Sequence, residues 1–146
     1  MTRAQCIIHR DRQILMVKHS LDNEEWWCLP GGGVEPHETS AEAVLRELEE
    51  ECCVQGKIIR QTSHYIDGIG NDTDTFLVEI GDQVPQIGND PELEREHQIL
   101  VDLRWLTLAE IPERDRAYLW AAGLLNIPTF LDEVSNWGDV LSYPTE

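Results

Sequence analysis

The sequence lacks long apolar runs and is poor in basic residues. Its apolar stretches, such as Ile14–Val17, are far shorter than the roughly 20 residues that span a bilayer. The 146 residues carry 11 basic and 28 acidic side chains, which gives a net charge of −17. A protein so acidic repels nucleic acid polymers and anionic membranes, so we expect neither as a partner. Most of the acidic side chains are expected to serve solubility.

Cysteines are few and irregularly spaced. The four are Cys6, Cys28, Cys52 and Cys53, and none forms a C-x-x-C pair. This spacing predicts neither a zinc ribbon nor a disulfide framework. No apolar segment with a small-residue cleavage site stands near Met1, so we expect a cytoplasmic protein with reduced thiols. The length suits one domain, and we expect residues 1–146 to form it.

Short apolar runs separated by polar segments predict a chain of the α/β class. Runs at residues 4–9 and 13–18 predict a β-hairpin, and the polar residues 19–25 predict a loop. Pro30 followed by Gly31, Gly32 and Gly33 predicts a sharp loop. Further strands are predicted at residues 57–65, 75–80 and 103–106.

The C-terminal part is predicted to be helical from about residue 113 to 146, after a first turn at 107–111 that is interrupted near Pro112. Its apolar side chains predict that it packs on the domain or on a partner, so a homodimer is a possible assembly. These side chains are Phe130, Leu131, Val134 and Trp137.

The clearest element is a helix over residues 39–52. Thr39 and Glu42 have the spacing of a capping box, with Thr39 as the N-cap. One apolar stripe follows the helical period. It consists of Ala41, Val44, Leu45, Leu48 and Cys52.

Three carboxylates share a second face of this helix. Glu47, Glu50 and Glu51 stand at i, i+3 and i+4, about 120° around the axis from the apolar stripe. Because like charges so close repel one another, the cluster favours a hard cation such as Mg²⁺, Mn²⁺ or Ca²⁺. Arg46 can hold a carboxylate bidentately or reach the preceding loop. Taken alone, an ordinary solvated helix face explains this charged run equally well.

The spacing from Gly32 to Val54 decides between these interpretations. It reads Gly32, five residues, Glu38, seven residues, Arg46-Glu47-Leu48, one residue, Glu50-Glu51, one residue, Cys53-Val54. It resembles the Nudix box, G-x5-E-x7-R-E-U-x-E-E-x-G-U, where U is bulky and aliphatic, and it matches eight of the nine defined positions. The preceding Trp27–Gly32 segment resembles W-x-L-P-G-G, which usually leads into the box. The similarity extends over most of residues 1–125 and leaves the tail unexplained.

The resemblance to the Nudix (MutT-like) hydrolases implies an α/β/α sandwich with a mixed sheet, in which the box forms a loop-helix-loop. It implies that Glu50 and Glu51 bind an essential Mg²⁺, or Mn²⁺ in its place. Glu47 binds metal or acts as the base, and which carboxylate is the base stays open. Arg46 orients a carboxylate.

Three further roles follow from the same resemblance. Glu38 supports the box, and Gly31 and Gly32 let the backbone pass close to the helix and the pyrophosphate. The implied activity is hydrolysis of a phosphoanhydride bond in a nucleoside diphosphate that is linked to another group.

Substrate specificity must come from outside the box. Glu96, in an acidic loop that also holds Glu92 and Glu94, is a candidate for an extra metal ligand or base. Aromatic side chains can stack on a base, although core packing is the better expectation for each, and Tyr65 and Trp26 are the best placed. The full set is Trp26, Trp27, Tyr65, Phe76 and Trp105.

The substrate class stays open between nucleoside triphosphates, oxidised triphosphates and nucleotide sugars. The alternative function is that of a Nudix-fold binding or regulatory module without catalysis. The complete set of Arg46, Glu47, Glu50 and Glu51 favours the enzyme, because a module has no reason to keep a mutually repulsive cluster.

Cys53 is the one departure from the box, which has glycine there. Glycine after a helix permits a left-handed turn, and a cysteine that keeps this turn costs about 1 kcal/mol.

Overall fold

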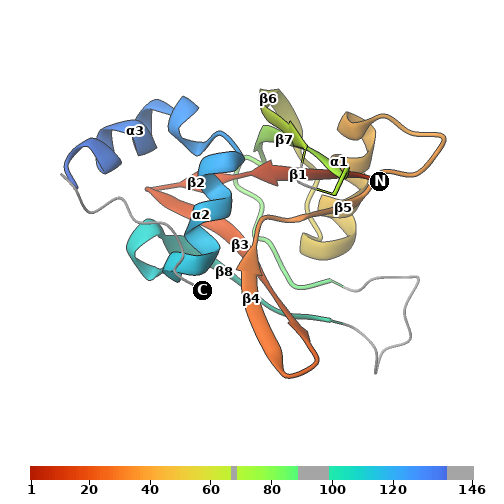
Figure 1. Cartoon of the computed structure of the whole chain (residues 1–146), viewed down its shortest axis with the longest axis horizontal. Helices are drawn as coiled ribbons and strands as arrows, with labels where there is room; N and C mark the ends of the chain where they lie inside the picture. Colours follow the sequence, from red (N-terminus) through yellow and green to blue (C-terminus); the bar gives the residue numbers. More distant parts are fainter. Residues whose placement is uncertain (67–68, 89–98, 138–146) are drawn as a thin grey trace.

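Two β-sheets and flanking helices make up the computed structural model, which describes residues 1–66, 69–88 and 99–137 (Figure 1). One sheet has the strand order β5-β1-β7-β6, and the other has the order β2-β3-β4 with β8 paired to β3. The strands are β1 (Thr2–Ile7), β2 (His9–Arg10), β3 (Gln13–Leu21), β4 (Glu24–Cys28), β5 (Gly31–Gly33), β6 (Lys57–Ile66), β7 (Asp72–Glu79) and β8 (Leu100–Thr107). The helices are α1 (Ser40–Cys52), α2 (Glu113–Ala121) and α3 (Pro128–Ser135), with 3-10 turns η2 (Leu108–Glu110) and η3 (Leu124–Asn126).

The first sheet is mixed, because β1 runs parallel to β7 and antiparallel to β5. Successive residues of β1 and β3 point to opposite faces, as the two-residue period of a strand requires. Cys6 and Leu15 pack in a buried cluster with α1, whereas Ile7 and Ile14 pack in a second cluster with α2 and α3. Helices therefore cover both faces (Figure 1), which confirms the expected α/β/α arrangement.

The predicted hairpin of residues 4–9 and 13–18 was wrong in its extent. Only His9 and Arg10 pair with β3, around a two-residue turn at Asp11 and Arg12 whose φ angles are 52° and 64°. The reason is that β1 is an inner strand with β5 and β7 on its two edges, while β3 is flanked by β4 and β8. A local apolar pattern does not reveal such non-local pairing.

Two predicted loops are also strands. Residues 19–25 continue β3 and begin β4 around a tight turn at Asp22 and Asn23, which both have positive φ. Backbone pairing and not apolar burial holds this exposed hairpin together, so its polar sequence was misleading. The glycines predicted as a sharp loop form β5 against β1, because they are needed for close approach of backbone and not for a turn.

The predicted helix over residues 39–52 is confirmed as α1. Thr39 is its N-cap, and both hydrogen bonds of the capping box with Glu42 are present. Cys53 keeps the left-handed turn that the box glycine would adopt, with φ 58° and ψ 34°. At the same end the backbone N–H groups of Gln86 and Gly88 donate to the Cys52 and Glu51 carbonyls, at 2.9 Å and 2.8 Å. The segment before residue 89 thereby fixes the end of the helix that carries the carboxylates.

The C-terminal segment up to residue 137 packs on the sheet, as its apolar residues predicted, and forms α2, η3 and α3. Residues 138–146 of the predicted helical tail lie outside the described residues. Phe130 and Val134 of α3 are buried in the cluster that contains Ile7 and Ile14, and Leu131 is 48% exposed. No helix in the described ranges is both long and apolar enough to cross a membrane.

We predict that Phe130→Ala lowers the free energy of unfolding by about 3–5 kcal/mol, because it leaves a cavity in a closed core. Leu131→Ala on the same helix is the matched control and should cost less than about 1 kcal/mol. Urea denaturation measures both. Equal, small losses would show that α3 is not part of the cooperative core.

Candidate functional site

Glu47, Glu50 and Glu51 of α1 line one cavity of about 450 Å³, which we call the carboxylate pocket. The glycines of β5 and Arg46 line the same cavity. Glu49, which the helical period places elsewhere, is exposed. The structure therefore brings together the three carboxylates that the i, i+3, i+4 spacing placed on one face.

Arg46 is the cation at the centre of this carboxylate face. Its guanidinium donates bidentately to Glu38, with Nη2–Oε1 at 2.6 Å and Nε–Oε2 at 3.1 Å. It also donates from Nη1 to Glu47 at 3.0 Å and to Glu50 at 3.4 Å, and from Nη2 to the Gly33 carbonyl at 3.1 Å. One side chain thus links α1 to the loop before it and to β5. The hydrogen bonds from Arg46 and then the Glu35 N–H lower the pKa of Glu38 to about 2.

The glycines of β5 are required by contact with α1 and β1. A Cβ at Gly32 would lie 2.5 Å from the Glu47 carboxylate, and a Cβ at Gly31 would lie 2.2 Å from the Ala4 carbonyl oxygen. The Gly31 N–H donates to Glu51 Oε1 at 2.8 Å. Bare backbone therefore forms one wall of the carboxylate pocket and leaves room for the side chain of Glu47.

Burial and like charge act together on Glu47. Burial raises its pKa most, the Glu51 and Glu50 charges raise it further, and Arg46 opposes them, so that the pKa lies at about 7. This carboxylate is ionised only at an energetic cost, which a cation in the pocket would relieve.

The side chains that line the carboxylate pocket are of the type that binds hard divalent cations. In the part of the chain that the structure describes, no group of three or more Asp, Glu, His or Cys side chains is arranged so that it could hold a metal ion as it stands. Glu47 and Glu50 accept from Arg46, and Glu51 accepts from the Gly31 N–H. Mg²⁺, however, binds through one or two carboxylates and completes its shell with water and phosphate oxygens. Glu47, Glu50 and Glu51 line one open pocket, so one or two of them are within reach of such an ion there.

His19 lies at the edge of the carboxylate pocket. Its Nε2 is 3.8 Å from Glu51 Oε2 and 3.9 Å from Cys28 Sγ. Burial lowers the pKa of His19, but these contacts with Cys28 and Glu51 outweigh burial and raise it to about 9. An imidazolium beside Glu51 partly compensates the charge of the cluster.

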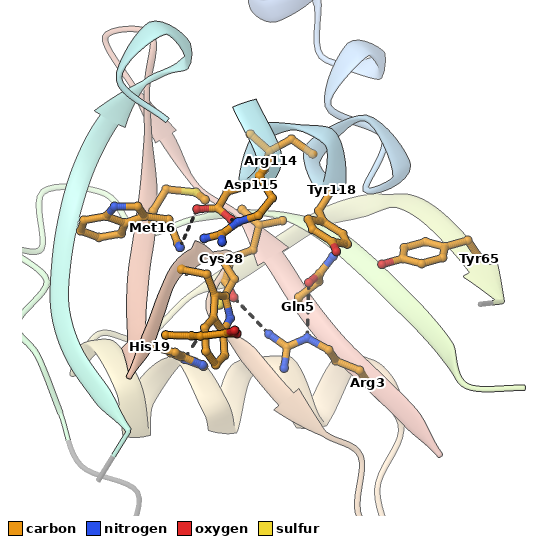
Figure 2. Close-up of a pocket in the computed structure, with 14 residues that line it drawn as sticks. Arg3, Gln5, Met16, His19, Cys28, Tyr65, Arg114, Asp115 and Tyr118 are labelled. Atoms are coloured by element: carbon orange, nitrogen blue, oxygen red, sulfur yellow. Dashed lines mark hydrogen bonds and ion pairs between the residues drawn. The ribbon is translucent and has the colours of Figure 1, made fainter. Parts of the chain in front are cut away.

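A second cavity of about 540 Å³, which we call the aromatic pocket, lies beside the first. Figure 2 shows residues that line it, among them Tyr65, Tyr118, Asp115 and Arg114. Trp26 and Trp27 of β4 also line it. Asp115 is buried, and it accepts from the Trp27 N–H at 3.0 Å and from Arg114 Nε at 3.1 Å.

The aromatic residues named from the sequence separate into two groups. Tyr65, Trp26 and Trp27 line the aromatic pocket. Phe76 is a core residue, and Trp105 packs against the same cluster, with Arg10 over its ring at 4.7 Å. Core packing, the better expectation for all five, is therefore confirmed for Phe76.

Some site residues were missed by sequence reasoning, and one candidate lies outside the described residues. This candidate is Glu96, which was named as an extra metal ligand or base. Glu92 and Glu94 of the same acidic segment also lie outside the described residues. Arg3 and His19 line both pockets but belong to no motif. The position of Arg3 at the pockets follows from the sheet register, in which Arg3 pairs directly with Gly33.

Comparison with known proteins gives one family and one fold. The NUDIX domain family matches residues 1–126. Diphosphoinositol polyphosphate phosphohydrolase 2 of Rattus norvegicus is 43% identical over 61 residues, which are 40% of this chain and 34% of that protein. The Homo sapiens protein of the same name is 41% identical over 61 residues, 40% of this chain and 33% of that protein. This chain thus matches about a third of the length of these curated relatives.

Solved structures share the arrangement of strands and helices. A MutT NUDIX hydrolase from Burkholderia pseudomallei superposes with a TM-score of 0.65 at 24% identity, covering 83% of this chain and 93% of that one. A C. elegans Ap4A hydrolase superposes with a TM-score of 0.66 at 18% identity, covering 90% and 98%. At these identities the likeness shows the fold.

We predict that Glu47 makes the metal-free protein less stable as the pH rises from 5 to 8. Its pKa in the folded state is raised above the ordinary 4.5 to about 7, so its stabilising contribution is complete below pH 4.5 and is lost through pH 7. Glu47→Gln should remove this loss. The unfolding free energy of the variant, relative to the wild type, should therefore increase across this window when measured by denaturation in chelator.

Glu49→Gln, which removes an exposed charge from the same helix, is the control for Glu47→Gln and should follow the wild-type profile. Parallel profiles for Glu47→Gln and wild type would contradict the assigned environment of Glu47.

Proposed function

The chain belongs to the Nudix family, and from this membership we propose that it is a metal-dependent pyrophosphohydrolase. Its substrate would contain a phosphoanhydride bond in a diphosphate linked to another group. The observation that carries the proposal is the single pocket that Glu47, Glu50 and Glu51 line against the bare backbone of β5. Such a pocket suits polyanionic phosphates only when a cation is present with the carboxylates.

We assign the metal to Glu50 and Glu51, with Mg²⁺ or Mn²⁺ as the ion, and place Glu47 beside them as a further ligand or as the base. Nudix hydrolases are in general dependent on divalent metals. A bound divalent cation neutralises charge on the phosphates and lowers the pKa of a water molecule. Arg46 holds Glu47 and Glu50 in place while its bidentate pair with Glu38 fixes its own position. Gly31 and Gly32 line the same pocket, and their bare backbone lets β5 pack closely against β1 and the Glu47 side chain.

Among the three carboxylates, we propose Glu47 as the group that takes the proton from the attacking water. In the metal-free protein, burial and the charges of Glu51 and Glu50 raise the pKa of Glu47 to about 7, which is close to the pH at which a general base works best. The Glu47 carboxylate packs against the bare backbone of Gly32 and lines the carboxylate pocket. Glu50 and Glu51 then serve as metal ligands.

The aromatic pocket supports a nucleotide as the substrate. Trp26, Trp27, Tyr65 and Tyr118 line it and offer flat faces to a base. The names of the curated relatives refer to diphosphoinositol polyphosphates, whose many phosphates would need a dense cluster of cations.

The described lining of the aromatic pocket lacks such a cluster. Arg3, Arg114 and His19 stand there with the acidic Glu24 and Asp115. Arg114 is already paired with Asp115, and His19 lies 3.8 Å from Glu51. We therefore place nucleoside triphosphates, oxidised triphosphates and nucleotide sugars ahead of inositol polyphosphates. The partner is a small molecule in each case.

The function is tested by product release from a substrate panel, with Mg²⁺, with Mn²⁺ and with chelator. The panel holds nucleoside triphosphates, 8-oxo triphosphates, nucleotide sugars, dinucleoside polyphosphates and a diphosphoinositol polyphosphate. We expect metal-dependent cleavage of a nucleotide. Preferred cleavage of the inositol compound would overturn the substrate class, and a folded protein that binds Mg²⁺ without cleaving any compound would favour a binding module.

We predict that Glu50→Gln lowers turnover of the best panel substrate by two or more orders of magnitude, because a metal ligand is lost. The fold should persist, since Glu50 is a partly exposed side chain. Glu49→Gln is the control and should keep turnover within about twofold. Circular dichroism and initial rates at saturating Mg²⁺ measure the two effects, and unchanged turnover in Glu50→Gln would remove Glu50 from the mechanism.

A further inference from the structure

The carboxylate pocket and the aromatic pocket meet at two side chains. Among the described residues, Arg3 and His19 are the ones that line both. Arg3 stands on β1 opposite Gly33, and His19 stands on β3 opposite Trp26. A molecule that reaches from one pocket into the other must therefore pass beside Arg3.

Neutral groups hold the guanidinium of Arg3. Its Nη2 donates to the Leu29 carbonyl at 3.2 Å, and its Nε donates to Gln5 Oε1 at 3.4 Å. Figure 2 shows both interactions, with the guanidinium pointing from β1 toward Cys28 and His19. Gln5 is itself buried and fixed by a 2.9 Å hydrogen bond from its Nε2 to Thr75 Oγ1. The position of Arg3 is thus set before any ligand arrives.

In the described part of the chain, Arg3 forms no ion pair with a carboxylate. Arg46, Arg104 and Arg114 each form at least one. The other described arginines without an ion pair line neither pocket, and they are Arg10, Arg12, Arg60 and Arg116. The chain carries 28 acidic residues, yet the two groups that hold the partly buried Arg3 are neutral. The positive charge of Arg3 is therefore available to an anion. A guanidinium has five N–H donors in a fixed plane, and the two contacts above use two of them in a side chain that lines both pockets.

We propose that Arg3 binds the phosphate that links the two halves of the substrate, at the junction of the carboxylate and aromatic pockets. The inference rests on the proposed function, because it takes the substrate to span both pockets. The phosphate under attack lies with the carboxylates, and the next phosphate accepts charge-assisted hydrogen bonds from Arg3. Arg3 thereby sets which phosphoanhydride bond faces the carboxylates.

The test uses inorganic pyrophosphate as the probe and isothermal titration calorimetry as the measurement, with Mg²⁺ and, separately, with chelator. Arg3→Gln should weaken pyrophosphate binding about tenfold or more, as expected for the loss of charge-assisted hydrogen bonds. Arg3→Lys, which keeps the charge and loses the planar fork, should give a smaller loss. Arg12→Gln removes the same charge from the exposed β2–β3 turn and should bind like the wild type.

A measurement on the wild-type protein needs no variant to fold. The Nε–H resonance of Arg3, assigned in a 15N spectrum, should shift on addition of pyrophosphate, and that of Arg12 should not. Equal affinity of Arg3→Gln and wild type, absence of pyrophosphate binding, or an unmoved Arg3 resonance would each overturn the proposal.

Failure of this inference is distinguishable from failure of the proposed function. Metal-dependent cleavage of a panel substrate with unchanged pyrophosphate binding in Arg3→Gln would leave the hydrolase standing and remove Arg3. Arg3-dependent pyrophosphate binding without cleavage of any substrate would support Arg3 as a phosphate ligand and count against the hydrolase.

Discussion

The bidentate pair between Arg46 and Glu38 is the interaction on which the rest of the site depends. A helix that carries Glu47, Glu50 and Glu51 on one face is repulsive by itself. Arg46 offsets part of that repulsion by donating to Glu47 and Glu50, but it can do so only if its own guanidinium is fixed. Glu38 fixes it, with both carboxylate oxygens engaged and a pKa of about 2 that keeps it ionised. The separation of eight residues between Glu38 and Arg46 in the box is thus the spacing of one ion pair across the start of α1.

The second constraint is close approach between β5 and α1. Because β5 is bare backbone, Glu47 can lie against Gly32, and Glu51 can accept the Gly31 N–H. The same strand pairs with β1, so Arg3 is carried to the pocket by the register that places it opposite Gly33. A substitution that pushed β5 from α1 would therefore disturb the carboxylates and the proposed phosphate ligand together. The three glycines of β5 allow close packing of this strand and do not make it flexible.

The sequence was sufficient for α1 and insufficient for the surroundings of the helix. The capping box of Thr39 and Glu42 and the apolar stripe are local signals, and they located α1 to within one residue. The composition of the glycine strand and of the polar β3–β4 hairpin predicts loops. Backbone pairing makes both of them strands, and this pairing is local in the hairpin and non-local between β5 and β1. Arg3 and His19 belong to no local motif, so the sequence does not indicate that they line the two pockets. Cys53 shows the converse, since the helix end keeps its left-handed turn although the residue that favours such a turn is absent.

The charge of the chain limits where an anionic substrate can be held. With a net charge of −17, the surface as a whole repels phosphates, and the carboxylate face of α1 repels them most strongly. Attraction must then be local, from a cation among the carboxylates and from fixed positive side chains at the rim. Arg46 is already committed to Glu38, Glu47 and Glu50, and Arg114 to Asp115. Arg3 is the arginine of the described pocket lining whose hydrogen-bond partners are both neutral. This single available guanidinium is the reason why we propose a substrate with a short phosphate chain and a flat, uncharged group and not one with many phosphates.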